Sequence, residues 1–192
     1  MRLIIDSGST KTDWICINEK GEVLFDTKTK GLNPQVLTEQ IIEERVINNF
    51  DLYQKRKKIS HLYFYGAGCG TESPRKLIKK VFERIFINSL IDIKEDTYAA
   101  IYATCEPGIK SITSILGTGS NCTYYDGKNI LQKVDSLGYV LMDDASGNYF
   151  GRQLIRDYYF DKMPLSVQKS ISKSFDMQSN TIKDHIYKRP NP

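Results

Sequence analysis

The sequence predicts an α/β protein built from two tandem repeats, each of which begins with three consecutive antiparallel strands. The apolar residues 3–5 open the chain and two further β-like runs follow, and the same order returns after residue 108. In each repeat a turn of small residues, 6–12 or 116–120, separates the first two runs. Stretches with helical spacing of apolar residues follow the strands, so helices are expected to cover the sheets.

The first repeat, residues 1–107, is expected to run β-β-β-α-β-α-β-α. Strands are predicted over residues 2–5, 13–18, 22–28, 61–65 and 89–93. Helices are predicted over residues 35–54, 73–86 and 96–104. Ser73 and Pro74 suit the first turn of the second helix, because proline is tolerated where the backbone N–H has no helical partner.

The second repeat, residues 108–192, follows a natural linker at residues 106–108. Strands are predicted over residues 110–116, 121–125 and 129–135, and helices over 149–159 and 165–175, before a polar, proline-bounded tail over 184–192. The later strands of the first repeat have no counterpart here. The second repeat is therefore expected to be incomplete.

Composition limits the class of protein. With 192 residues, 40% of them hydrophobic and 26% charged, the chain is typical of a soluble protein that can bury a core. The net charge of +4 includes one local run, residues 55–58, which indicates a solvated helix end; a nucleic-acid patch is the alternative, but it lacks interleaved aromatic residues. The four cysteines are scattered and predict reduced thiols. A cytoplasmic protein without nucleic-acid or membrane partners is expected, because neither a signal peptide nor a membrane span is visible.

The first turn has the chemistry of a nucleotide-phosphate site. Asp6 ends an apolar strand, where its carboxylate can hold Mg²⁺ directly or through water. Gly8 allows the backbone to approach phosphate oxygens, and Ser9, Thr10 and Lys11 offer hydroxyls, amides and a cation. The alternative is a plain β-hairpin in which the small residues serve only the turn.

Three motifs carry a resemblance to a known family. Residues 6–12 resemble the first phosphate motif of the N-acetylglucosamine kinase branch of the actin-like, sugar kinase and heat-shock chaperone ATPase superfamily, a branch that also contains the benzoyl-CoA reductase activator ATPases. Residues 117–120 are similar to its second phosphate motif, and residues 143–147 lie where the family carries Gly-Asp-Glu-Gly-Ser. The resemblance implies a ribonuclease H-like fold whose mixed sheet has three antiparallel strands followed by β-α-β-α, in tandem repeat with the second unit incomplete.

The resemblance also implies roles for individual residues. Asp96, at a strand-to-helix junction, matches the catalytic general base, although its position also suits a helix N-cap, which the residues favour without the resemblance. Asp6 would hold the metal. The nucleotide would be bound by residues of the two turns: Ser7, Gly8, Ser9, Thr10, Lys11, Gly117, Thr118, Gly119 and Ser120.

Four further residues match positions that border the sugar in related kinases: Asn33, Gly68, Cys69 and Asp143. Each has a structural alternative. Asn33 precedes a proline as turn residues do, the glycines around Cys69 suit a tight turn, and Asp143 suits a helix start. The chain departs from the family at Met142 and Ala145, where glycines are usual, and at Asp144, where glutamate is usual.

The function that the resemblance implies is an ATP-dependent carbohydrate kinase that phosphorylates N-acetylglucosamine or a related amino sugar, with ATP and Mg²⁺ as cofactors. An ATPase activator of a CoA dehydratase or reductase stays open, in which Cys105 and Cys122 would hold an iron–sulfur cluster between the subunits of a dimer. A non-catalytic nucleotide-binding protein is a further alternative. Because the second repeat stops early, the 192 residues are expected to be a fragment with weak or no kinase activity.

Overall fold

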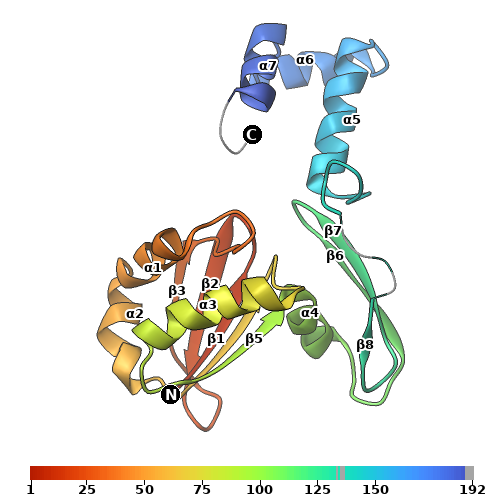
Figure 1. Cartoon of the computed structure of the whole chain (residues 1–192). Coiled ribbons are helices and arrows are strands. Elements are labelled where there is room, and N and C mark those ends of the chain that lie inside the picture. Colours follow the sequence, from red (N-terminus) through yellow and green to blue (C-terminus); the bar gives the residue numbers. More distant parts are fainter. Residues whose placement is uncertain (133, 135–136, 189–192) are drawn as a thin grey trace. The chain divides into compact units, whose positions relative to one another are not determined.

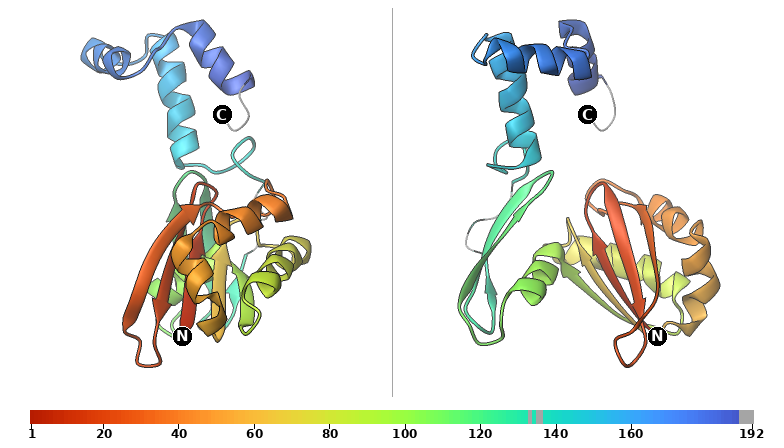
Figure 2. Two further views of the ribbon diagram at one scale, coloured as in Figure 1. Left: turned by 90° about the vertical axis from the view of Figure 1, so that its left-hand side faces the viewer. Right: turned by 180° about the vertical axis from the view of Figure 1, so that it is seen from behind.

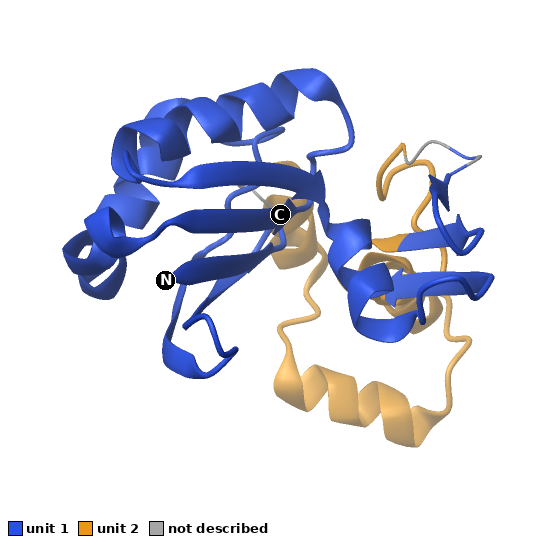
Figure 3. Ribbon diagram, turned by 90° about the horizontal axis from the view of Figure 1, so that it is seen from below, with its two compact units in different colours: residues 1–115, 121–135 blue, residues 116–120, 136–192 orange. Residues whose placement is uncertain are grey.

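The computed structural model of the chain describes residues 1–132, 134 and 137–188. It divides into two compact units, shown in Figure 3: unit 1 comprises residues 1–115 and 121–135, and unit 2 comprises residues 116–120 and 136–192. The predicted boundary between the repeats, at residues 107 and 108, lies between α4 (Asp96–Thr104) and β6 (Ser111–Leu116).

Unit 1 is built on a five-stranded sheet with the order β3-β2-β1-β4-β5 (Figure 1). Its strands are β1 (Arg2–Ser7), β2 (Lys11–Ile17), β3 (Val23–Lys30), β4 (His61–Gly66) and β5 (Leu90–Glu95). The β1–β2 and β2–β3 pairs are antiparallel, whereas β4 pairs in parallel with both β1 and β5. This order confirms the predicted mixed sheet.

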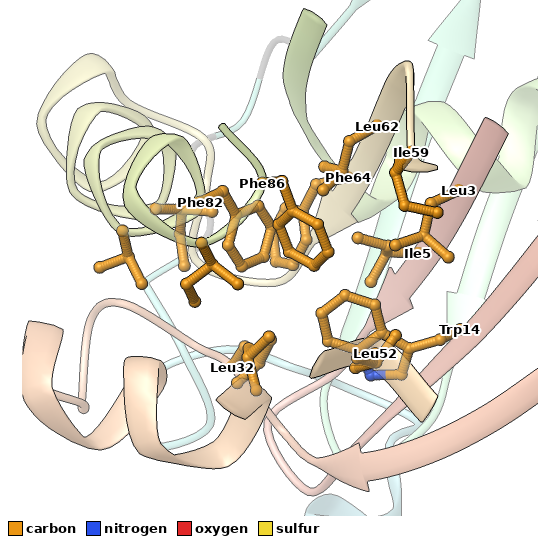
Figure 4. Close-up of a cluster of buried hydrophobic side chains, with 14 of the residues drawn as sticks. Leu3, Ile5, Trp14, Leu32, Leu52, Ile59, Leu62, Phe64, Phe82 and Phe86 are labelled. Atoms are coloured by element: carbon orange, nitrogen blue, oxygen red, sulfur yellow. The ribbon is translucent and has the colours of Figure 1, made fainter. Parts of the chain in front are cut away.

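Three helices cover one face of this sheet: α1 (Glu39–Ile47), α2 (Phe50–Lys55) and α3 (Glu72–Ile85). The sheet side chains beneath them come from alternate strand positions, such as Leu3 and Ile5 of β1, because successive side chains point to opposite faces. Phe82 of α3 lies at the centre of this core, 5.4 Å from the Phe64 ring and 6.0 Å from that of Trp14 (Figure 4). Burial of these large rings is a main source of stability for unit 1.

The helix α4 packs against the opposite face of the sheet. Its Tyr102 ring lies 6.2 Å from the ring of Tyr65, which alternates along β4 with the core residue Phe64. This placement puts the start of α4 directly after the last strand of the sheet. Asp96 is therefore the first residue of α4, as the predicted range 96–104 requires.

The helix predicted over residues 35–54 is two helices in the structure. Thr38 caps α1, since its hydroxyl accepts a hydrogen bond from the Ile41 N–H, and Asn49 caps α2 by accepting from the Leu52 N–H at 3.1 Å. The Asn49 amide also donates to Thr27 of β3 at 2.9 Å. The chain breaks here because asparagine satisfies the free N–H groups of a helix start. The basic run 55–58 ends α2 and continues into a short 3₁₀ turn (Arg56–Lys58), as a solvated helix end should.

A smaller sheet has the order β6-β7-β8, in which β6 is followed by β7 (Ser120–Tyr125) and β8 (Ile130–Leu131). In the described part of the chain, β8 is thus much shorter than the strand predicted over residues 129–135. Residues 133 and 135 of that range lie outside the described part. Asp126 turns the chain between β7 and β8 by accepting hydrogen bonds from the Lys128 and Asn129 N–H groups at 2.8 and 2.6 Å.

The described residues of unit 2 form three helices, α5 (Gly147–Tyr159), α6 (Leu165–Ser174) and α7 (Ser179–Tyr187). Figure 2 shows them from two further sides. The Tyr158 hydroxyl lies 2.8 Å from that of Ser172, which ties α5 to α6. The helix α7 extends to residue 187 and so includes the start of the polar tail expected from residue 184; residues 189–192 lie outside the described chain. No helix of the described ranges has the length and apolarity to cross a membrane.

Candidate functional site

The turn between β1 and β2, residues 7–11, presents two exposed hydroxyl side chains, and we call it the Gly8 hairpin. The Gly8 N–H donates to the Lys11 carbonyl at 3.0 Å, which leaves Ser9 and Thr10 at the tip. The Lys11 ammonium lies 2.8 Å from the Asp13 carboxylate, and this hydrogen bond raises the pKa of Lys11. The tip thus offers hydroxyl groups beside a cation that Asp13 already partners.

Ser7, which the resemblance places among the nucleotide contacts, has its side chain turned inward. Its buried hydroxyl lies 2.8 Å from that of Thr12 and accepts a hydrogen bond from the Leu32 N–H at 3.0 Å. With these partners the hydroxyl holds the hairpin in place, and only the backbone of Ser7 remains to contact a ligand. The alternation of exposed and buried positions along β1 predicts this inward direction of the Ser7 side chain, because Leu3, Ile5 and Ser7 share the buried face.

The carboxylates of Asp6, Glu95 and Asp96 lie at the carboxyl end of the parallel strands. The register places Ser7 opposite Gly66, and Gly66 opposite Glu95, so Asp6, the residue before the last of β1, lies toward the edge where Asp96 follows β5. Open α/β sheets bind ligands at this edge. Asp6 and Asp96 are close enough that the charge of Asp6 raises the pKa of Asp96.

Loss of hydration is the largest effect on both aspartates. It raises the pKa of Asp96. Hydrogen bonds from the backbone N–H groups of Thr97 and of Asp96 itself lower this pKa in part. Loss of hydration also raises the pKa of Asp6, with a further increase from the neighbouring Asp13 and a decrease from Lys11. A carboxylate whose pKa is raised toward neutrality accepts a proton more readily, which suits a general base.

The N-cap interpretation of Asp96 is wrong. The N-cap position of α4 belongs to Glu95, whose side chain makes no capping hydrogen bond, and Asp96 stands inside the first turn. Sequence reasoning did not select Glu95, although it directly precedes Asp96. Its carboxylate lies beside Gly70, where an added β-carbon would stand 3.1 Å from Oε1. Burial and the adjacent Asp96 raise the pKa of Glu95.

The loop after β4, residues 66–70, is called the Gly68 loop. Gly68 has a φ of +81°, a conformation that glycine adopts without strain, and its α-carbon packs against the side chain of Asn33. Asn33 in turn donates to the Ser9 hydroxyl at 3.0 Å. The structure therefore brings Asn33 and Gly68 together with the tip of the Gly8 hairpin.

Cys69 faces the hydrophobic core and is fully buried. Loss of hydration raises the pKa of its thiol to about 12, so the group stays protonated and is unreactive as a nucleophile. Only the backbone of this residue can border a ligand.

Unit 2 holds the second group of predicted residues. The turn 116–120, called the Gly119 turn, packs against the loop 143–147. The Ser120 hydroxyl donates to the Asp144 carbonyl at 2.7 Å, and a β-carbon on Gly119 would stand 2.6 Å from the Asp143 carboxylate. The predicted phosphate residues of this turn, Gly117, Thr118, Gly119 and Ser120, are thereby grouped with Asp143.

The Gly119 turn also contacts the start of α5. The Gly147 N–H donates to the Gly117 carbonyl at 2.8 Å, and the Asn148 N–H donates to the Thr118 carbonyl at 3.3 Å. The Ser146 hydroxyl caps the helix by accepting from the Tyr149 N–H at 3.1 Å. These N–H groups of the first helical turn are therefore occupied by protein oxygens.

The loop 143–147 is strained at two residues. Asp143 has a φ of +65° and Ala145 a φ of +60°, in the left-handed region that costs side-chain-bearing residues about 1–2 kcal/mol. Ala145 stands where the resembling kinases carry glycine. The glycine of the family pattern thus suits the left-handed backbone conformation at this position, which this chain adopts with a strained alanine.

The donor groups at the Gly8 hairpin suit a magnesium ion. Mg²⁺ prefers oxygen ligands and keeps several of its waters, so one carboxylate beside nucleotide phosphates suffices to bind it. Asp6 offers that carboxylate near the end of β1, where the charges of Asp13 and Lys11 act on it. Within the described chain, no group of three or more His, Cys, Asp or Glu side chains is placed to hold a metal by itself.

All four cysteines are free thiols. Cys16 and Cys69 are buried, Cys105 is half-buried and Cys122 is exposed. The Cys105 sulfur lies 3.1 Å from the Thr113 hydroxyl, and this hydrogen bond lowers the pKa of the thiol.

No protein-family model and no curated protein matches the chain. Among solved structures, it is similar to a candidate N-acetylglucosamine kinase from Porphyromonas gingivalis, with 34% sequence identity and a TM-score of 0.88 over 100% of this chain and 68% of that one.

Two more distant structures share the fold alone. One is a candidate N-acetylglucosamine kinase from Chromobacterium violaceum, 15% identical with a TM-score of 0.70 over 98% of this chain and 68% of that chain. The other is an inorganic polyphosphate/ATP-glucomannokinase from an Arthrobacter strain, 16% identical with a TM-score of 0.50 over 80% and 72% of the two chains.

Proposed function

Because the chain belongs to the N-acetylglucosamine kinase family, a branch of the sugar kinases with the actin-like ATPase fold, we propose that it transfers the γ-phosphoryl group of ATP to a hydroxyl of an amino sugar, N-acetylglucosamine. The observation that carries the proposal is the 34% identity to the Porphyromonas gingivalis protein over the full length of this chain. The placement of Asp96 and Asp6 at one sheet edge supports it.

Asp96 acts as the general base in this proposal. Its carboxylate stands in the first turn of α4, where loss of hydration raises its pKa, and a higher pKa makes the ionised carboxylate a stronger proton acceptor. It accepts the proton of the attacking sugar hydroxyl. The hydroxyl oxygen thereby becomes a better nucleophile toward the γ-phosphorus.

The Gly8 hairpin binds nucleotide phosphates through the exposed hydroxyls of Ser9 and Thr10 and the backbone N–H groups at its tip, which donate hydrogen bonds to phosphate oxygens. In unit 2, taken by itself, the Gly119 turn is the proposed phosphate-binding turn. Asp6 holds Mg²⁺, which when bound neutralises charge that develops on the phosphates. Lys11 contributes a positive charge, reduced by its ion pair with Asp13.

The sugar is bound by residues that border the Gly68 loop. Asn33 supplies amide hydrogen bonds, and the absence of a side chain at Gly68 lets the substrate approach the backbone closely. Asp143 is the proposed sugar contact of unit 2, and the Met142 and Ala145 departures fall beside it. The amino sugar is therefore the part of the proposal that needs the most direct test.

The test is ADP release measured with Mg-ATP and a panel of N-acetylglucosamine, glucosamine, N-acetylmannosamine and glucose. With the full-length protein, we expect release with N-acetylglucosamine and a reduction of at least ~10²-fold in the Asp96→Asn variant. The control is Asp26→Asn, which changes an exposed carboxylate of β3. Sugar-independent ADP release, or equal turnover in wild type and Asp96→Asn, would contradict the proposal.

A second function is an ATPase activator whose subunits share an iron–sulfur cluster, favoured only by the lowered pKa of Cys105 and the exposure of Cys122. Iron content and visible absorbance after anaerobic purification decide between the two. Iron binding that is lost in Cys122→Ser would favour the activator.

A further inference from the structure

A short segment of the chain links the Gly8 hairpin to the Gly68 loop. Residues 31–35, called the bridging segment, contact the hairpin through the Gly31 N–H, which donates to the Thr10 carbonyl at 2.9 Å. At the other end, the Gln35 side-chain amide donates to the Gly68 carbonyl at 3.2 Å. The segment is therefore anchored to both parts of the proposed site.

Asn33 lies in the middle of the bridging segment with its amide orientation fixed. Its Oδ1 accepts from the Gln35 N–H at 2.9 Å, which identifies the oxygen end of the amide. Its Nδ2 donates to the Ser9 hydroxyl at 3.0 Å. The Gly68 α-carbon packs so closely against this side chain that a β-carbon on Gly68 would clash with it.

The direction of this hydrogen bond constrains the proton of Ser9. A serine hydroxyl has one proton and two acceptor lone pairs, and here one lone pair accepts from Asn33. The proton of Ser9 is thus directed away from Asn33 and is free to be donated to a phosphate oxygen. Asn33 keeps a second amide proton, because only one of its two is used by Ser9.

The bridging segment is also held from behind. The Arg45 guanidinium of α1 donates to the Gly31 carbonyl, and the Leu32 N–H donates to the buried Ser7 hydroxyl at 3.0 Å. These contacts leave little freedom for the segment to shift independently of the hairpin. A change at Ser9 therefore acts on Asn33 through their direct hydrogen bond.

We propose that Asn33 and Ser9 form a hydrogen-bond relay through which nucleotide at the Gly8 hairpin raises the affinity for sugar at the Gly68 loop. The inference rests on the proposed function. When Ser9 donates to a phosphate oxygen, its hydroxyl becomes a stronger acceptor for Asn33, and hydrogen bonds in such a chain reinforce one another. The Asn33 amide is then held in the position from which it donates to the sugar, and by reciprocity the sugar raises the affinity for nucleotide equally.

The test is the dissociation constant of N-acetylglucosamine, measured by calorimetry with and without saturating Mg²⁺ and a non-hydrolysable ATP analogue. In the wild-type chain we expect the nucleotide to tighten sugar binding by about 5- to 150-fold, the usual range of such coupling. In Ser9→Ala the ratio of the two constants falls to within about twofold, and this ratio is the readout, because loss of the Asn33 contact also changes sugar affinity without nucleotide. A purely structural role for Ser9 would not change this ratio selectively.

Two more variants sharpen the result. Asn33→Asp replaces the donor by an acceptor, so the Ser9 proton turns toward residue 33 and the ratio falls as in Ser9→Ala. Gln40→Ala removes an exposed amide of α1 that bonds only Glu44 among the described contacts, at 3.2 Å, and keeps the wild-type ratio. Thermal melting of each variant checks that it folds.

A wild-type ratio in Ser9→Ala, or a ratio of one in the wild type with both ligands bound, would overturn the relay and leave the kinase proposal intact. If the folded wild-type chain binds none of the sugars in either condition, the proposed function fails and the relay fails with it.

Discussion

A β-carbon on Gly31 would lie 2.5 Å from the carbonyl oxygen of Gly8, and closer still to that of Ser9. The Gly8 hairpin thus folds directly over residue 31, and its carbonyls occupy the space that any side chain would need. Gly8 itself has room, since a β-carbon there would stand 3.7 Å from the Lys11 carbonyl. The strictest steric requirement of the hairpin therefore falls on a residue outside its motif.

This contrast predicts opposite outcomes for two matched substitutions. Gly31→Ala should lower the free energy of unfolding by about 1–3 kcal/mol or more, because the colliding atoms are backbone on both sides and the hairpin must move. Gly8→Ala should change it by less than about 1 kcal/mol. Urea denaturation of the two variants checks this, and an equal loss in both would contradict the geometry.

Ala145 predicts a stabilising substitution. Its φ of +60° strains a side-chain-bearing residue, whereas glycine adopts this conformation freely. Ala145→Gly should raise the free energy of unfolding by up to about 1 kcal/mol, since relief of strain outweighs the greater freedom of glycine in the unfolded chain. The control is Ala100→Gly inside α4, which should lower it by about 1 kcal/mol. A loss of stability at both positions would show that residue 145 is not strained.

The raised pKa of Asp96 predicts a pH-dependent effect on stability. A carboxyl group whose pKa is higher in the folded than in the unfolded chain destabilises the fold when it is ionised, so its penalty is full above the folded pKa and vanishes below the ordinary value of 3.8. Asp96→Asn should therefore be more stable than wild type at pH 7, and the difference should shrink as the pH falls toward 3.8. Denaturation midpoints at pH 7, 5 and 3.5 measure it; a difference independent of pH would rule out this cause.

Asp6 predicts the metal dependence of nucleotide binding. Asp6→Ala should abolish the part of ATP affinity that depends on Mg²⁺ and leave sugar binding measurable, because the carboxylate and the phosphates share the ion. Calorimetric titration of Mg-ATP tests this, with Asp26→Ala in exposed β3 as the control. Unchanged Mg-ATP affinity in Asp6→Ala would contradict the metal role and indicate that the hairpin is purely structural.

Much of unit 1 was predictable from local patterns. The alternation of apolar residues in strands and their helical spacing in α3 and α4 reflect short-range geometry, and the small-residue turns between strands are equally local. The range of α4, Asp96–Thr104, was predicted to the residue, and the mixed sheet that begins with three antiparallel strands was predicted as well. The helix α7 was missed because its polar sequence masks a spacing carried by only two isoleucines, Ile182 and Ile186.

The sequence by itself determined which residues are proposed for the chemistry: the carboxylates at strand ends, the hydroxyls of the Gly8 hairpin and the glycines of both turns. Tertiary structure alone decided how they are arranged. Asn33 meets Ser9 across 24 residues and Gln35 meets Gly68 across 33, while Ser7 and Cys69 turn into the core. Such contacts depend on strand register and on which backbone segments approach one another. The local pattern of residue types along the sequence encodes neither, because packing energies act between residues that are distant in the chain.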